Sequence, residues 1–328
     1  MTRSDTSADD RTIGSDILAM IHEAESRIRG FVMETPVVRV PESVSTRGTL
    51  FLKLEQLQKT GSFKLRGATN KVMSLPEPAA LAGVVTSSTG NHGLGVAAAA
   101  KHRRIDAEVF VSTQVPLSNL ERMQEFGARI RKVGNTPLES ELAARSAAAE
   151  TGRAYVSPYN DPLVVAGQGT IGIELKRQIP QFDGVYVAAG GGGLISGIGS
   201  YLKNVSPQVE IIGCWPENSR VLYECLKAGR VIAHQESYTV SESTAGGVEE
   251  ESITLPLAQK VVNRGILVTE NEILNAMGWA HSRGWEIEGA AGVALAAFFK
   301  ESAEQRGKAV VVLFCGGNIS PGVRKRLR

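Results

Sequence analysis

The sequence contains few of the residues that stabilise secreted or membrane proteins. It has three cysteines in 328 residues, Cys214, Cys225 and Cys315, without the spacing of a metal site or a disulfide framework. A sparse, odd set of cysteines suits a reducing compartment, so we expect a cytoplasmic protein. No apolar stretch approaches the length that spans a membrane, and residues 1–16 lack the apolar core of a signal peptide.

A strong net charge and a high aromatic content are also absent. Lys and Arg number 36 against 34 for Asp and Glu, a net charge of +2, and 5% of residues are aromatic. The basic clusters at residues 129–132 and 324–328 have no interleaved aromatics, so we interpret them as solvated faces. We therefore expect neither nucleic acid nor a membrane as a partner. We also expect residues 1–16 to be a flexible arm, and no regulatory domain to follow Arg328.

What is present is the composition of a globular enzyme with alternating helix and strand patterns. With 42% hydrophobic residues, the chain is long enough for two domains. A helix is expected to begin at Ser15, with Ile17, Ile21 and Ile28 on its apolar side. Short apolar runs between helical patterns predict an α/β fold with parallel sheets. These strand-like runs lie at residues 50–54, 83–86, 108–111, 129–133, 185–189, 210–214 and 309–314.

The segment around Lys64 has the setting of an imine-forming amine. Lys64 follows a Gly61-Ser62 turn and the ring of Phe63, on the first turn of a predicted helix. A helix N-terminus and the neighbouring cation Arg66 both disfavour another positive charge, so we expect a lowered pKa at Lys64. A neutral amine attacks aldehydes. Taken alone, the segment also fits an ordinary basic helix start.

Four consecutive glycines at residues 190–193 follow an apolar run and precede a predicted helix. Without side chains in the way, backbone N–H groups at a helix start can converge on an anion, so this loop predicts a phosphate site. The Gly-Lys-Ser/Thr of a Walker loop is absent, and Ser196 stands where a dinucleotide fingerprint needs its third glycine. The alternative is that the glycines only permit a tight strand-to-helix turn.

A second turn, at residues 86–93, combines hydroxyls, an amide and a histidine at the start of an alanine-rich predicted helix. Such a turn can bind a substrate carboxylate through Ser88, Thr89 and exposed N–H groups. Taken singly, Ser88 and Thr89 also fit plain N-caps, and His92 fits a packed core residue.

Cys315 follows the continuous apolar run at residues 309–314, whose two faces we expect to be buried. Ligands of open α/β sheets bind beyond the carboxyl ends of strands, which predicts that Cys315 faces the site. The alternative is a small buried hydrophobic residue.

Together and in this order, the motifs resemble those of the pyridoxal-phosphate (PLP) enzymes of the tryptophan synthase β-like family, fold type II. The branch is that of threonine deaminases, serine dehydratases and serine racemase. The resemblance implies a two-domain α/β fold with the cofactor in the cleft: a large PLP-binding domain of residues 1–81 and 159–328, and a small inserted domain of residues 82–158. It covers nearly the whole chain and rests on residues 62–68, 88–93, 190–194 and 315–318.

The resemblance also implies roles for the motif residues. Lys64 would carry the cofactor as an imine, Asn91 would bond the ring hydroxyl, and Cys315 would approach the pyridine nitrogen. The implied catalytic residues are Lys64 and Thr89. The implied substrate-binding residues are Ser88, Thr89, Gly90, Asn91 and His92. The implied cofactor-binding residues are Phe63, Lys64, Asn91, Gly190, Gly191, Gly192, Gly193, Leu194, Gly247, Glu288, Cys315 and Gly316.

The function that this site implies is a PLP-dependent ammonia-lyase, which converts a β-hydroxy amino acid such as L-threonine or L-serine to a 2-oxo acid and ammonia. The freed Lys64 amine is the only strong base among the motif residues, so it is the candidate for removing the Cα proton. A thiol such as Cys315 cannot keep the pyridine nitrogen protonated as an aspartate would, which favours prompt elimination. The expected partner is a small-molecule amino acid, and relatives suggest a homodimer or homotetramer.

Departures from the family pattern leave the substrate open. Thr89 keeps a hydroxyl opposite Lys64, so a serine or other amino-acid racemase is an alternative, although the threonine methyl obstructs proton transfer. A dehydratase of the hydroxyectoine pathway shares the Ser-Thr-Gly-Asn-His-Gly loop, and a 3-hydroxyaspartate-type dehydratase is a further alternative. The acidic residues 249–251 fit a solvated loop or a site that attracts a distal positive group on the substrate.

No metal site is expected. Racemase-like relatives bind a divalent cation through a glutamate, and Trp215 stands at that position here. An indole cannot ligate magnesium or calcium, unless Glu217 substitutes from a shifted position.

Overall fold

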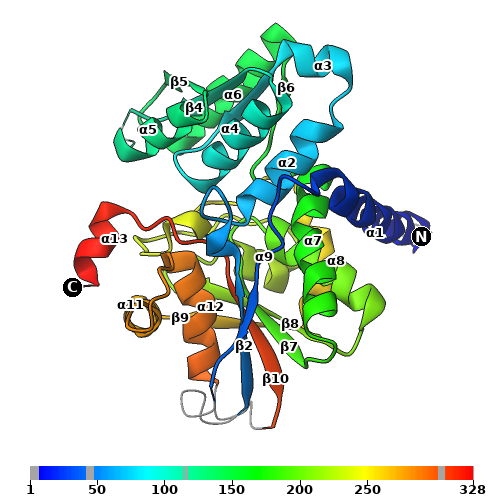
Figure 1. Cartoon of the computed structure of the whole chain (residues 1–328), viewed down its shortest axis with the longest axis vertical. Helices are drawn as coiled ribbons and strands as arrows, with labels where there is room; N and C mark the ends of the chain where they lie inside the picture. The colour runs from blue at the N-terminus through cyan, green and yellow to red at the C-terminus, as the bar shows by residue number, and fades with distance from the viewer. Residues whose placement is uncertain (1–6, 42–47, 114, 116, 302–306, 328) are drawn as a thin grey trace, which may run out of the picture.

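A computed structural model describes residues 7–41, 48–113, 115, 117–301 and 307–327, and it contains two sheets flanked by helices (Figure 1). The six-stranded sheet has the order β1-β2-β10-β7-β8-β9, and the four-stranded sheet has the order β5-β4-β3-β6. All neighbours pair in parallel except β1 with β2. The predicted α/β fold with parallel sheets is confirmed. The strands are β1 Val37–Arg39, β2 Thr49–Leu54, β3 Val84–Ser87, β4 Ala107–Val111, β5 Arg129–Lys132, β6 Ala154–Tyr155, β7 Gly184–Ala188, β8 Glu210–Pro216, β9 Arg264–Val268 and β10 Ala309–Phe314.

Helices cover both faces of the six-stranded sheet. Helix α12 packs on β10, β7 and β8, while α8 packs on the other side with α7 and α1 behind it (Figure 1). The helices are α1 Ser7–Ile28, α2 Lys64–Ser74, α3 Glu77–Ala82, α4 Asn91–Arg103, α5 Leu117–Glu125, α6 Pro137–Thr151, α7 Pro162–Gln178, α8 Gly193–Val205, α9 Val221–Ala228, α10 Thr254–Val261, α11 Glu270–His281, α12 Gly289–Lys300 and α13 Pro321–Arg326, with 3-10 turns η1 Glu55–Leu57 and η2 Glu242–Thr244.

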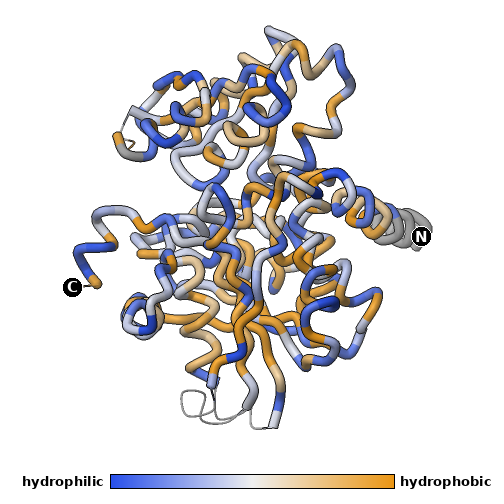
Figure 2. Tube along the Cα trace, in the orientation of Figure 1, coloured by the Kyte–Doolittle hydropathy of each residue, from blue (hydrophilic) through white to orange (hydrophobic). Residues whose placement is uncertain are grey.

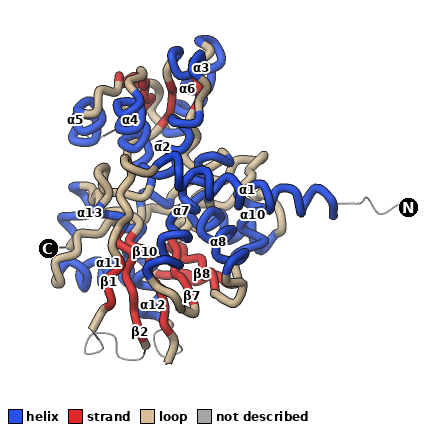
Figure 3. Tube along the Cα trace, turned by 45° about the vertical axis from the view of Figure 1, so that its right-hand side comes forward, coloured by secondary structure: helices blue, strands red, loops and turns tan. Residues whose placement is uncertain are grey.

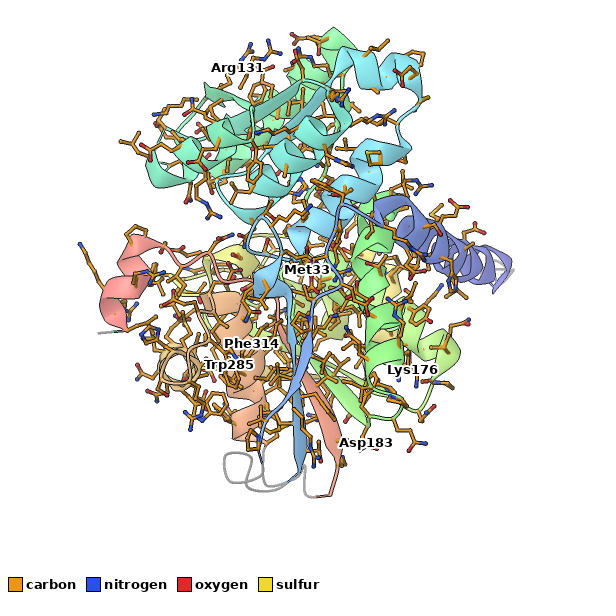
Figure 4. The ribbon with its side chains drawn as sticks, viewed as in Figure 1. Met33, Arg131, Lys176, Asp183, Trp285 and Phe314 are labelled. Carbon is orange, nitrogen blue, oxygen red and sulfur yellow. The ribbon has the colours of Figure 1, made fainter. Side chains whose placement is uncertain are left out.

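The core of the larger sheet lies around β10. This strand pairs with β2 on one side and β7 on the other, and its residues 310–314 are buried. Figure 2 shows the strands of this sheet as the hydrophobic centre of the lower half of the molecule. The ring of Trp285 packs edge-on against Phe314, 6.1 Å between ring centres, and Figure 4 shows the two residues together. The prediction that both faces of this strand are buried is confirmed.

The strand predictions are confirmed for every run named from the sequence, including residues 129–133, where basic and apolar residues are mixed. All seven predicted runs form strands. Strands β1, β6 and β9 lie outside these seven runs; β6 has two residues, and in the edge strand β9 buried residues alternate with partly exposed ones. Strand β6 is too short and strand β9 too mixed to give a pattern of its own.

The N-terminal prediction was wrong. Helix α1 begins at Ser7, not at Ser15, so residues 7–16 are helical and do not form the flexible arm, while residues 1–6 lie outside the described chain. The polar stretch before Ile17 has no apolar stripe, so the hydrophobic pattern carried no signal of helix there. No helix among the described residues is long and apolar enough to cross a membrane.

The two sheets follow the predicted domain pattern. Strands β3, β4, β5 and β6 all lie within residues 82–158, and the strands of the larger sheet lie outside this range. Figure 3 shows the two groups of strands as separate layers. The domain boundaries themselves stay a prediction.

Helix α2 joins the two halves. It packs against α4, beside the smaller sheet, and against α7, beside the larger one. Figures 1 and 3 show it at the junction. Any side chain on its first turn is therefore held between the two sheets.

A buried ion cluster fixes this helix. Arg66, on α2, donates to Glu55 at 2.7 and 2.8 Å and to Glu174 at 2.6 and 2.8 Å. Lys53 donates a third bond to Glu174 at 2.5 Å, and all four side chains are nearly inaccessible to solvent. The Arg66 guanidinium also donates to the carbonyl oxygen of Met33, which Figure 4 shows at the junction of the two halves.

The cluster is held together by charge against the cost of burial. Burial raises the pKa of Glu55, but the charge and hydrogen bonds of Arg66 outweigh that effect and hold this pKa below its usual value. Removing one partner would leave the others charged and without compensation in a dry interior.

We predict that Arg66→Met lowers the free energy of unfolding by about 3–5 kcal/mol, because it leaves Glu55 and Glu174 buried without their main cation. The matched control is Arg177→Met on α7, whose side chain is 49% exposed and pairs with Glu34 and Glu25 at the surface. This control should cost about 0–1 kcal/mol. Urea unfolding of the cofactor-free protein measures both, and equal losses would show that the buried cluster does not stabilise the fold.

Candidate active site

Lys64 is the first residue of α2, as predicted, and the turn before it is bonded to the segment after β10. Phe63 N–H donates to the Cys315 carbonyl at 3.0 Å, and Gly317 N–H donates to the Gly61 carbonyl at 2.9 Å. The start of α2 is thereby fixed at the carboxyl end of a central strand, where ligands of α/β sheets bind.

Two cavities meet at Lys64. The first has a volume of about 660 Å³ and the second about 620 Å³, and both are lined by Lys64 and Asn91. Among the predicted site residues, only Gly316 lines neither; a side chain there would meet the Glu288 carboxylate, whose carbon lies 2.8 Å from the position of a Cβ. The first cavity also brings together Phe63, Gly190, Gly191, Gly192, Gly193, Leu194, Gly247, Glu288 and Cys315. The second brings together Ser88, Thr89, Gly90 and His92.

The Lys64 amine is buried and already oriented. Its Nζ donates to the Pro158 carbonyl at 2.7 Å and lies 5.3 Å from the centre of the Phe63 ring. Burial lowers the pKa of Lys64 to about 8, although negative charge at Cys315 and Glu288 would act in the opposite direction. The expected lowering is thus present.

The predicted cause of that lowering was wrong. The guanidinium of Arg66 is neutralised by Glu55 and Glu174 and does not appear among the influences on Lys64. Desolvation of the amine lowers its pKa instead.

The glycine loop connects β7 to α8 and leaves its N–H groups free. Within the described chain, none of the N–H groups from Gly190 to Leu194 donates to a protein acceptor outside regular helix bonding. Gly192 has φ +89, a left-handed conformation that favours glycine. A Cβ on Gly191 would lie 2.5 Å from the Tyr159 ring, so only glycine fits against that ring. Free N–H groups at the start of a helix agree with the predicted phosphate site, which stays a prediction.

The hydroxyl side chains of the loop at residues 88–92 do not cap helix α4. The N-cap of α4 is Gly90, without a side-chain cap, and Ser88 Oγ accepts a bond from Gly90 N–H at 3.2 Å. Asn119, from α5, donates to the Thr89 carbonyl at 2.8 Å. The N-cap interpretation of Ser88 and Thr89 is thus wrong, and their place beside the second cavity agrees with substrate binding, which stays a prediction.

His92 is a packed residue at the edge of that cavity. Its Nε2 lies 2.9 Å from the Val156 carbonyl, and burial lowers the pKa of His92 to about 3. The ring is therefore neutral with its proton on Nε2, and the buried Nδ1 has no partner in the described part of the chain. A neutral ring can accept but cannot offer a substrate carboxylate a charged donor.

Asn91, Glu288 and Cys315 face the first cavity. Asn91 Nδ2 lies 2.9 and 2.8 Å from the two carboxylate oxygens of Glu288. Burial raises the pKa of both Glu288 and Cys315, so the thiol is protonated and uncharged at neutral pH.

Several residues of the site gave no signal in the sequence. Tyr159 packs against Gly191, and Thr254 Oγ1 donates to the Gly191 carbonyl at 2.6 Å. The Pro158 carbonyl receives the Lys64 amine. A carbonyl and packing contacts have no residue signature, and only the Pro-Tyr-Asn turn before the N-cap Asp161 marked a loop at this point.

The acidic segment after Gly247 is already paired. Glu249 accepts bonds from Arg145 at 2.9 Å and from Asn160 at 3.0 Å, whereas Glu250 and Glu251 are exposed. A cation of the chain itself thus meets Glu249. Glu250 and Glu251 fit a solvated loop, whereas Glu249 lines the first cavity and its buried Oε1 has no hydrogen-bond partner in the described part of the chain, so a site for a distal positive group stays a prediction.

Trp215, which stands where racemase-like relatives have a metal-binding glutamate, is part of the hydrophobic core. Trp215 is fully buried at the end of β8 against Tyr223, while Glu217 is exposed. Among the described residues, no group of three or more His, Cys, Asp or Glu side chains is placed to hold a metal ion.

The residues present fit the cofactor that the motifs imply. PLP has an aldehyde, a phosphate and an aromatic ring with a hydroxyl group, and the first cavity has an amine of lowered pKa, a free N–H cradle and an amide. Lys64 would hold the aldehyde, the loop from Gly190 to Leu194 the phosphate, and Asn91 the hydroxyl group.

We predict that PLP reacts with the cofactor-free protein at a rate that rises with pH up to about 8 and then levels. Only the neutral amine attacks an aldehyde, and the Lys64 pKa is about 8 where an exposed lysine has 10.5. Stopped-flow absorbance between about pH 6 and pH 10 measures this, with Lys64→Arg as the background control. A rate that keeps rising towards pH 10 would mean that the amine is not desolvated.

Several known proteins are similar to this chain in sequence or in overall fold. An L-threonine ammonia-lyase of Thermotoga maritima is 36% identical over 309 residues, which cover 94% of this chain and 77% of the relative. The structure of maize serine racemase matches with a TM-score of 0.88 at 30% identity, covering 94% of this chain and 95% of the racemase. Processed threonine deaminase isoform 2 of Solanum lycopersicum matches with a TM-score of 0.88 at 27% identity, covering 98% and 93%.

A family model agrees with these similarities and with the site. The model of pyridoxal-phosphate dependent enzymes matches residues 28–316, which include Lys64, the glycine loop and Cys315. The residues that line the first cavity lie within the segment that this family model matches. The chain therefore belongs to the family of pyridoxal-phosphate dependent enzymes, with fold type II.

Proposed function

We propose that the protein is a PLP-dependent ammonia-lyase that converts a β-hydroxy amino acid such as L-threonine or L-serine to a 2-oxo acid and ammonia. The observation that carries this proposal is the 36% identity, over 94% of the chain, to an L-threonine ammonia-lyase. The site supports it, because a single buried amine faces both the glycine cradle and the hydroxyl-bearing loop.

The substrate amine and carboxylate have separate places in this proposal. Bound PLP supplies electron withdrawal from the substrate, which acidifies its Cα–H bond. The loop from Ser88 to Asn91 holds the carboxylate with hydroxyl and N–H donors beside Lys64. This arrangement fixes the Cα–H bond relative to the lysine.

Lys64 is the base that removes the Cα proton. Its pKa of about 8 makes a neutral amine available near neutral pH, and it is the lysine that lines both cavities in the described part of the chain. The Pro158 carbonyl accepts a bond from the amine at 2.7 Å and orients it. The proton that Lys64 takes is thereby held within the site.

Cys315 sets the electronic character of the site. As a buried thiol with a raised pKa, it offers no negative charge to a pyridine nitrogen. A ring with an unprotonated nitrogen would take up less of the negative charge that forms at the substrate Cα, which favours prompt loss of the β-hydroxyl over slower reactions of a carbanion.

Racemisation is the second candidate function. Serine racemase of maize shares the fold at 30% identity, and Thr89 supplies a hydroxyl in the same cavity as Lys64. A racemase needs a second proton donor on the opposite face of the substrate, and the branched Thr89 is the residue available for it.

Two further features belong to this proposal. The cysteines Cys214, Cys225 and Cys315 are free and buried, which supports a cytoplasmic enzyme in a reducing compartment. A homodimer or homotetramer follows from the resemblance to oligomeric relatives, and light scattering of the purified protein tests it.

We predict that the PLP-loaded protein releases 2-oxo acid from at least one of L-serine, L-threonine, threo-3-hydroxyaspartate or a β-hydroxy diamino acid. Lys64→Ala should abolish turnover, while Lys71→Ala, which breaks an ion pair with Asp161 two turns further along α2, should retain it. Coupled dehydrogenase assays measure the 2-oxo acid, and chiral chromatography of the remaining substrate detects racemisation. Inversion of the substrate Cα without release of 2-oxo acid from any substrate would contradict the lyase proposal and support the racemase.

A further inference from the structure

A chain of hydrogen bonds crosses from α5 to the first cavity. Arg122, on α5, donates through Nη1 to Asn318 Oδ1 at 2.8 Å, and Asn318 Nδ2 donates to Asn91 Oδ1 at 2.6 Å. Asn91 Nδ2 donates in turn to the Glu288 carboxylate. We call these four side chains the amide relay. Its members come from four separate segments, which are α5, the loop after β10, the start of α4 and the N-cap of α12.

Arg122 sets the direction of the relay at one end, and the Thr60 carbonyl and the Glu288 carboxylate accept hydrogen bonds in the same direction. A side-chain amide can be turned two ways, because its oxygen and nitrogen occupy similar space. An arginine only donates, so Asn318 has to present its oxygen to Arg122. The Asn318 nitrogen then faces Asn91 and also donates to the Thr60 carbonyl at 2.8 Å. Asn91 is left with its oxygen towards Asn318 and its N–H donors towards Glu288.

Arg122 has no other evident structural task. In the described part of the chain it forms no ion pair with a carboxylate, although it lines the second cavity. Asn119, three residues earlier on the same helix, donates to the Thr89 carbonyl. Helix α5 thus contacts the site through two polar side chains, and Arg122 is the one that reaches the larger sheet.

We propose that Arg122 is a positioning residue that fixes, through Asn318, the amide of Asn91 with its N–H donors towards the cofactor site. The proposal rests on the proposed function, in which Asn91 bonds the oxygen of the cofactor ring hydroxyl. An N–H donor stabilises negative charge on that oxygen, whereas a reversed amide would place its own oxygen there and against the Glu288 carboxylate. Arg122 touches neither cofactor nor substrate in this role.

Asn318→Asp tests the direction of the relay with almost no change of shape. An aspartate still accepts from Arg122, but it cannot donate to Asn91 Oδ1 or to the Thr60 carbonyl. We expect the affinity for PLP to fall about 10-fold, the scale of losing a supporting contact around a bound group. The pH at which the visible absorbance of the bound cofactor titrates should rise, because the ring oxygen loses its donor. Equilibrium dialysis and absorbance titration measure the two effects.

Variants of Arg122, at the α5 end of the relay, also test the direction of hydrogen-bond donation. Arg122→Gln allows either direction, since glutamine both donates and accepts, and it should shift affinity and titration in the same sense as Asn318→Asp. Arg122→Lys only donates and should restore the wild-type absorbance. The matched control is Arg129→Gln on the outer strand β5, where a 57% exposed arginine pairs with Asp106 away from both cavities. It should behave as wild type.

The outcomes separate this inference from the proposed function. Wild-type affinity and absorbance titration in both Asn318→Asp and Arg122→Gln would overturn the inference while leaving the lyase intact. Equal behaviour of Arg122→Lys and Arg122→Gln would show that the direction of donation does not matter, and would also overturn it. A wild-type protein that binds no PLP would overturn the proposed function and this inference together.

Discussion

The buried ion cluster of Arg66, Glu55, Glu174 and Lys53 is the interaction on which the site depends. It ties α2 to β2 and to α7 through side chains that are at most 7% exposed, and α2 begins with Lys64. Because charged groups in a dry interior tolerate little change in geometry, the first turn of α2 has one position between the two sheets. The backbone bonds of residues 61 and 63 to the end of β10 complete this anchorage. The lysine is consequently held where it is desolvated and reactive.

Two buried cations on α2 are in different environments: Arg66 is paired with carboxylates, whereas Lys64 is desolvated without such a partner among the described residues. Arg66 is compensated by two carboxylates and stays charged, whereas Lys64 lies beside a carbonyl and an aromatic ring, and its pKa falls to about 8. Neighbouring groups follow the same principle, since burial keeps the Cys315 thiol protonated and the His92 ring neutral. The two cavities therefore combine one reactive amine with a protonated thiol, a neutral imidazole and a loop of free N–H groups. That combination suits a cofactor with an aldehyde and a phosphate.

The sequence predicted the motifs that carry the chemistry better than the contacts between distant segments. The glycine loop, the segment at residues 88–92 and the strand before Cys315 each had a local pattern, and the structure brings them to the same two cavities. The origin of the lowered pKa at Lys64 was not predictable, because burial and the pairing of Arg66 arise only when distant segments meet. Pro158, Tyr159 and Asn318 were missed as site residues for the same reason. The helical start of α1 was missed because its residues carry no apolar stripe.

The central claim is that one amine, at Lys64, carries the cofactor and the reaction. Borohydride reduction of the PLP-loaded protein makes the carbon–nitrogen bond between cofactor and lysine permanent, and peptide mapping by mass spectrometry then identifies the residue. The account predicts a single modified peptide that contains Lys64, since this amine is buried with a pKa of about 8 beside the cradle. Modification at Lys59 or Lys71, with Lys64 unmodified, would contradict it.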